Sequence, residues 1–92
     1  MSHTVQNQKK LLARVRRIKG QLQALEKALE TEQDCAIVLH LIAAVRGATD
    51  GLMNQVLEEH IRSHIADPSI TDQAERTQAA EELISALRSY LK

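Results

Sequence analysis

The sequence contains no tryptophan, no phenylalanine and a single tyrosine, Tyr90, among its 92 residues. An aromatic core is therefore excluded, and leucine, isoleucine, valine and alanine must supply the buried surface. Because leucine and alanine favour helices, whereas aromatic and β-branched residues favour strands, the composition indicates an all-α fold. Apolar residues make up 43% of the chain, which argues against disorder and fits one small domain over residues 1–92.

Cysteine is almost as scarce. Cys35 is the only cysteine, so the chain cannot form an internal disulfide, and a secreted disulfide framework is excluded. The N-terminal segment MSHTVQNQKK lacks the apolar stretch of a signal peptide. No unbroken apolar run reaches the ~18 residues that a membrane span needs. We therefore expect a soluble, cytoplasmic protein with no membrane partner.

The two signs of charge are unevenly placed, although the net charge is zero. Residues 1–20 contain six basic side chains and no acidic one, so this segment is +6 and residues 21–92 are −6. The six are Lys9, Lys10, Arg14, Arg16, Arg17 and Lys19. Such a basic segment predicts a polyanionic partner.

Apolar residues recur at helical spacing in three segments, which predicts three helices. The first runs from about Val5 to Glu30, with Gly20 as the expected position of a close helix crossing. The second begins after a capping Asp34 and continues to about Ile65. The third begins near Thr71, an expected N-cap that follows an Asp-Pro-Ser turn at 67–69. Three long helices with few large side chains leave apolar surface uncovered, so we expect at least a dimer.

His60 and His64 are the strongest local motif, because histidines four residues apart share one helical face and can share one ion. Cys35 lies 25 residues before His60, which returns almost to the same face but at a distance of about 40 Å along a helix. A second chain, packed antiparallel, would bring Cys35 of one chain to the His60 and His64 of the other. The midpoint falls at Gly47 and Ala48. These two belong to a cluster of small residues that favours close approach of two helices: Ala43, Ala44, Gly47, Ala48 and Gly51.

His3 is a further candidate ligand on the N-terminal arm, and the amine of Ser2 could add a nitrogen after removal of Met1. Imidazole with one thiolate suits nickel, cobalt and zinc, and the ligand types alone do not separate these ions. His40 lies off the Cys35 face, and we interpret it as structural or solvated. A lone cysteine without an orienting third group does not make a catalytic set, so no enzyme activity is predicted.

The basic helical face at the start of the chain predicts contacts with DNA phosphates. The residues that we expect to make them are Lys10, Arg14, Arg16, Arg17 and Lys19. No element that would read base edges is evident, so recognition through the backbone and the shape of the DNA is favoured. A purely structural helical interaction module is the other interpretation, but it leaves the basic segment unexplained.

Several segments together resemble the CsoR/RcnR/FrmR family of bacterial repressors. They are RVRRIKGQ (14–21), the cysteine at 35, IAAVRGA (42–48), GLM (51–53) and EEHIRSHI (58–65). The resemblance implies a three-helix protomer, an antiparallel helical dimer and a dimer-of-dimers tetramer. It also implies binding to double-stranded operator DNA that is lost when the inducer binds, with Arg14, Arg17 and Lys19 at the phosphates.

The ligand positions of this family sort its branches. Here they hold His3, Cys35, His60 and His64, a set that resembles the nickel- and cobalt-responsive branch, which represses efflux genes. The copper branch has a second cysteine in place of His64. The formaldehyde-responsive branch carries proline at position 2 and no histidine at position 64, so Ser2 and His64 depart from it. Formaldehyde sensing through Cys35 and the N-terminal amine is the alternative.

Overall fold

The computed structural model describes residues 5–91, with side chains from Asn7 onward, and within these residues the chain is helical without strands. Helix α1 is Val5–Glu30, α2 is Cys35–His60, the short π-helix η1 is Ile61–Ile65 and α3 is Gln73–Tyr90. The three predicted helices and the all-α fold are therefore confirmed. The predicted long second helix is present as α2 followed directly by η1, so the chain is helical without interruption from Cys35 to Ile65.

A tight turn joins α1 to α2. The Gln33 amide donates to the Ala28 carbonyl at 2.9 Å, and the Glu32 amide donates to the Leu29 carbonyl at 3.3 Å. This pair of bonds is a Schellman motif, in which the residue after the C-cap takes a left-handed conformation. Glu32 occupies that position with a φ of 53°. The Asp34 carbonyl then accepts from the amides of Ile37 and Val38 and begins α2 where the sequence predicted it.

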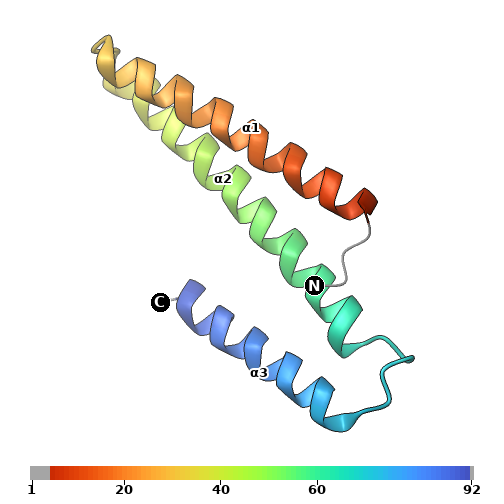
Figure 1. The fold of residues 1–92 in the computed structure, drawn as a ribbon. Helices are drawn as coiled ribbons and strands as arrows, with labels where there is room; N and C mark the ends of the chain where they lie inside the picture. Colours follow the sequence, from red (N-terminus) through yellow and green to blue (C-terminus); the bar gives the residue numbers. More distant parts are fainter. Residues whose placement is uncertain (1–4, 92) are drawn as a thin grey trace. The chain divides into compact units, whose positions relative to one another are not determined.

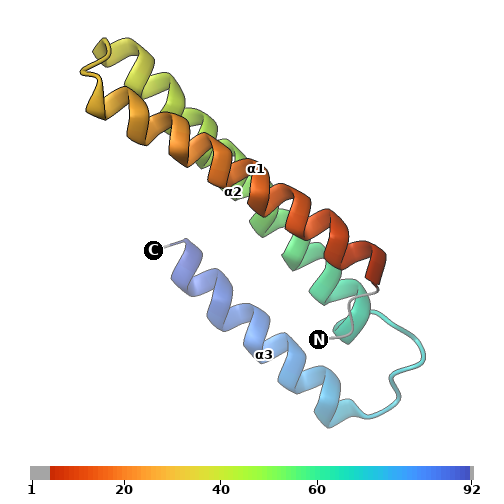
Figure 2. The same ribbon diagram turned by 45° about the horizontal axis from the view of Figure 1, so that its top comes forward.

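The chain divides into two compact units, which we call the hairpin unit (Thr4–Met53) and the C-terminal unit (from Asn54 onward). In the hairpin unit, α1 and the first part of α2 run side by side in opposite directions (Figures 1 and 2). Ala28 is buried, and Ile18, Leu25, Val38 and Val45 are half-buried. These residues form the seam between the two helices.

Much of the apolar surface of the hairpin unit is exposed in the part of the chain that the structure describes. On α1 the exposed large apolar residues are Leu12, Val15, Leu22 and Leu29, and on α2 they are Ile37, Leu39 and Ile42. Apolar residues spread this widely exceed what one neighbouring helix can bury. Outside its own stretch of helix, no atom of the described residues lies within 4 Å of the position that a Cβ at Gly20 would take, so no helix of the described chain crosses closely there and the expected crossing stays a prediction.

In the C-terminal unit, η1 and a short loop lead into α3. Asp72 caps α3, since its Oδ1 accepts the amide of Ala74 at 2.9 Å. The predicted cap at Thr71 was therefore one residue early. The Arg76 guanidinium holds the loop by donating to the Ile70 carbonyl at 2.8 Å and the Asp67 carbonyl at 3.1 Å. Ala79 is buried on the inner face of α3.

One helical stretch, Cys35–Ile65, is long and apolar enough to cross a membrane by length and composition, with a mean hydropathy of 1.4 in its most apolar window. We did not predict such a stretch, because no unbroken apolar run of sufficient length marks it in the sequence. One such stretch is weak evidence, because a core helix of a soluble protein passes the same test.

Candidate metal site and nucleic-acid interface

His60 and His64 lie close together where α2 passes into η1. Their ring centroids are 5.1 Å apart, with the ring planes tilted by 45°. Both side chains are half-buried. The π-helical turn starts directly after His60 and contains His64, and such turns occur frequently at functional sites. The structure therefore brings together the two histidines that the sequence paired.

The second contact of His60 fixes its tautomer. His60 Nε2 lies 3.0 Å from the Ala79 carbonyl oxygen on α3. A carbonyl oxygen can only accept a hydrogen bond, so Nε2 must carry the proton and donate it. In the neutral ring Nδ1 is then left with a free lone pair. Metal-bound histidines commonly donate their other ring N–H to a carbonyl or carboxylate in this way, so His60 is suited to bind an ion through Nδ1.

A cavity of about 370 Å³ adjoins the two histidines. Its lining is His60, His64, Glu75, Gln78, Ala79 and Glu82. Glu75 and Glu82 give this cavity two carboxylates from exposed positions of α3. Sequence reasoning missed them, although residues 75, 78, 79 and 82 follow the spacing of one helical face. Their negative charge favours a cation in the cavity.

Cys35 is free and exposed at the first position of α2. His60 is the last residue of the same helix, about 40 Å away by helical rise. Within the described part of the chain, no group of three histidine, cysteine, aspartate or glutamate residues could hold a metal ion. Cys35 and the two histidines therefore lie at opposite ends of α2. His40 is exposed, in agreement with a solvated role.

The remaining predicted ligands, Ser2 and His3, lie outside the described residues. Their assignment stays a prediction.

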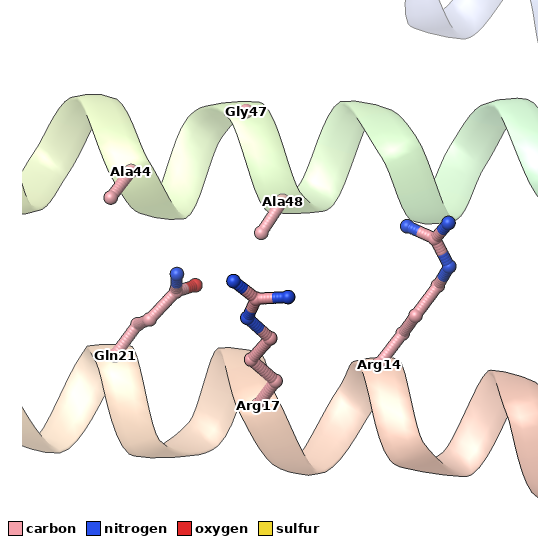
Figure 3. Close-up of a pocket in the computed structure, with 6 residues that line it drawn as sticks. All are labelled: Arg14, Arg17, Gln21, Ala44, Gly47 and Ala48. Atoms are coloured by element: carbon pink, nitrogen blue, oxygen red, sulfur yellow. The ribbon is translucent and has the colours of Figure 1, made fainter.

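A second cavity, of about 520 Å³, lies between α1 and α2 in the hairpin unit. We call it the basic groove; its lining is Arg14, Arg17, Gln21, Ala44, Gly47 and Ala48. Figure 3 shows Arg14, Arg17 and Gln21 extending from α1 toward the small residues of α2. Gln21 Oε1 is buried and has no hydrogen-bond partner. Two of the predicted DNA-contact residues thus share one groove.

The other three predicted DNA-contact residues do not line the basic groove. Lys10, Arg16 and Lys19 are exposed along α1. At 100° per residue, Lys10 shares the helical face of Arg14 and Arg17, whereas Arg16 and Lys19 lie on other sides of α1. The cations gathered on the first face are suited to several phosphates of a nucleic-acid backbone. Guanidinium groups can also bind phosphate oxygens in pairs, which fixes the position of the phosphate.

Comparison with known proteins places these sites in context. The profile of the family described as "Metal-sensitive transcriptional repressor" matches residues 7–89. The transcriptional repressor RcnR of Salmonella paratyphi B is 44% identical over 92 residues, which cover both chains completely.

Two solved structures share the fold. A glutamate-to-histidine variant of the formaldehyde-responsive regulator FrmR from Salmonella enterica serovar Typhimurium has a TM-score of 0.88 and 42% identity, over 96% of this chain and 98% of its own. The copper-sensing repressor CsoR with Cu(I) from Geobacillus thermodenitrificans also has a TM-score of 0.88, with 24% identity over 100% of this chain and 94% of its own. The second likeness concerns the fold alone.

Proposed function

Since the chain belongs to the metal-sensitive transcriptional repressor family and is not an enzyme, we propose that it is a nickel- or cobalt-responsive repressor. In this proposal the metal-free protein binds double-stranded operator DNA and represses efflux genes in the cytoplasm. Binding of nickel or cobalt releases the DNA. The observation that carries the proposal is the half-buried His60–His64 pair, with its rings 5.1 Å apart and Nε2 of His60 donating to the Ala79 carbonyl, which leaves Nδ1 unprotonated in the neutral ring.

The proposed ligands are His60 and His64 of one chain and Cys35 of the partner subunit, with His3 and the Ser2 amine from the N-terminal arm. The length of α2 supports a shared site, because one chain cannot bring its two ends to one ion. Three imidazoles and one thiolate favour nickel, cobalt or zinc over Cu(I), which prefers more sulfur. A bound ion would supply a cross-link between the arm, one end of α2 and the opposite end of the partner's α2.

We infer a homodimer that assembles further into a homotetramer. The exposed apolar residues of α1 and α2 support this inference, since a stable monomer rarely leaves such a surface in water. A symmetric dimer would create two identical metal sites.

The DNA contacts in this proposal come from Lys10, Arg14, Arg16, Arg17 and Lys19. Their support is the exposure of this basic segment and the absence of any acidic residue in positions 1–20. Because α1 follows directly on the arm that carries His3, ordering of the arm by a metal would act on the helix that holds these cations. A coupling of roughly 1–3 kcal/mol between the metal and DNA sites would be typical of allosteric proteins.

Formaldehyde sensing is the alternative function. The exposed, free Cys35 favours it, as does the likeness to a solved formaldehyde-responsive regulator. An aldehyde would join the thiol to the N-terminal amine and would not need His64.

One titration tests both functions. The protein, bound to a DNA fragment from upstream of its own gene, is titrated in parallel with Ni²⁺, Co²⁺, Zn²⁺ and formaldehyde, and the fraction of bound DNA is measured by fluorescence anisotropy. We expect release by nickel or cobalt, and no release by either ion from the His64→Ala variant. Release by formaldehyde alone, unchanged in His64→Ala and lost in Cys35→Ala, would establish the alternative instead.

A further inference from the structure

Gly51 on α2 lies against the guanidinium group of Arg14. A Cβ built at position 51 would lie 3.0 Å from Arg14 Nη1, which is closer than carbon and nitrogen atoms normally approach. Because Nη1 is the far end of a flexible side chain, a Cβ at position 51 would displace the Arg14 guanidinium by a few tenths of an ångström from its present position. In Figure 3 the Arg14 side chain runs from α1 to the α2 ribbon.

Gly47 provides the contrast one helical turn earlier. It lines the basic groove, but outside its own stretch of helix no atom of the described residues lies within 4 Å of the position that its Cβ would take. Both glycines lie inside α2, where each costs helix stability relative to alanine. In the sequence, Gly47 and Gly51 are equivalent members of one cluster of small residues. Among the described residues they differ, because Gly51 lies against a side chain of α1 and Gly47 does not.

We propose that Gly51 is a positioning residue for DNA binding, acting through Arg14. Because Gly51 has no side chain, the Arg14 guanidinium settles against α2, one turn along α1 from Arg17, which lines the same groove. The Arg14 side chain is exposed, so its guanidinium is open to a phosphate, and a displacement of its donors alters the geometry of such a contact. The two guanidinium groups then present donors to one section of the DNA backbone.

This inference rests on the proposed function, since it requires that Arg14 contacts DNA. It also gives α2, which carries Cys35 and His60, a direct contact with a DNA-binding side chain of α1.

The test compares Gly51→Ala with Gly20→Ala and combines Gly51→Ala with Arg14→Ala. Gly20 is an exposed helical glycine outside the lining of the basic groove, so Gly20→Ala controls for the gain in helix propensity and should leave DNA binding unchanged. Loss of a complete charge-assisted contact costs at least about tenfold in affinity. Because Arg14 can shift rather than vanish, we expect Gly51→Ala to weaken DNA binding by roughly threefold to tenfold. We also expect it to lower the slope of log affinity against log salt by up to about one. In the Arg14→Ala background, Gly51→Ala should have no further effect on either quantity.

The outcomes separate the two levels of the argument. The assignment of Arg14 in the proposed function is wrong if the unaltered protein binds no DNA. It is also wrong if Arg14→Ala binds DNA as tightly as the unaltered protein. If Arg14→Ala weakens binding but Gly51→Ala does not, or weakens it equally with and without Arg14, only the role of Gly51 is overturned. Sedimentation of all variants at the same concentration checks that their assembly is unchanged, and the double-variant comparison decides the question if Gly20→Ala alters assembly.

Discussion

The two units of the chain differ in charge and in the groups that they offer to a ligand. The hairpin unit holds eight basic and five acidic residues and a groove lined by two guanidinium groups. Residues 54–92 hold four basic and seven acidic residues and a cavity lined by two imidazoles and two carboxylates. The first set suits an anion and the second a cation. Among the described helices, only α2 extends into both units. We therefore expect substitutions in the hairpin unit to alter the proposed DNA binding and substitutions in the C-terminal unit to alter the proposed metal binding.

Replacement of His60 should produce the largest difference between the effect on metal binding and the effect on DNA binding. His60→Ala removes a proposed ligand together with the hydrogen bond to the Ala79 carbonyl. Since changes outside the ligand shell alone cost 10- to 100-fold in metal affinity, we expect nickel affinity to fall at least about 100-fold. DNA affinity should change by less than about twofold.

Isothermal titration with Ni²⁺ and anisotropy with labelled DNA measure the two quantities. His40→Ala is the matched control, because His40 is an exposed histidine on the same helix. An equal loss of nickel binding in both variants would remove His60 from the site.

Replacement of Arg17, in the hairpin unit, should weaken DNA binding and leave metal binding unchanged. Arg17→Ala removes one guanidinium from the basic groove. We expect DNA affinity to fall about tenfold and the salt slope to decrease by about one, with nickel affinity retained.

Arg88→Ala, which removes an exposed cation from α3, is the control and should bind DNA with an unchanged salt slope. A salt slope that Arg17→Ala leaves unchanged would mean that the groove is not in contact with phosphate.

The helices were predictable because their apolar periodicity is local, and the same is true of the His60–His64 pair. The contacts within each unit could be predicted less well from the sequence. A backbone carbonyl such as that of Ala79 has no signature in the sequence, so the partner of His60 was missed. Gly51 was predicted to favour the close approach of two helices, and its contact with the Arg14 guanidinium was not predicted. The cap of α3 was misplaced by one residue because Thr71 and Asp72 both suit an N-cap, and only the bond to Ala74 selects Asp72.

A stability difference of intermediate size is expected at the turn of the hairpin unit. Glu32 has a φ of 53°, which costs most residues about 1 kcal/mol and glycine very little. Glu32→Gly should therefore raise the free energy of unfolding by roughly 0.5–1 kcal/mol.

Urea unfolding at one fixed protein concentration measures the change, because stability of an oligomer depends on concentration. Glu26→Gly, at an exposed position inside α1, should instead lower the free energy of unfolding by about 1 kcal/mol. Equal destabilisation by both glycines would show that the turn gains nothing from a left-handed residue.

The smallest effect is expected in the loop of the C-terminal unit. The hydrogen bond from the Ser69 amide to Asp67 Oδ1, at 2.9 Å, lowers the pKa of the Asp67 carboxyl below 3.8, and the nearby Arg76 lowers it further. A lowered pKa in the folded state means that the ionised carboxylate stabilises the fold at pH values above 3.8. This contribution is lost as the pH falls through the lower, folded-state pKa. Asp67→Asn should therefore unfold at slightly lower urea than the unaltered protein at pH 7, and the difference should shrink steadily on acidification. A difference in the urea midpoint that stays constant from pH 7 down to the acid limit would mean that the Asp67 side chain acts through its shape rather than its charge.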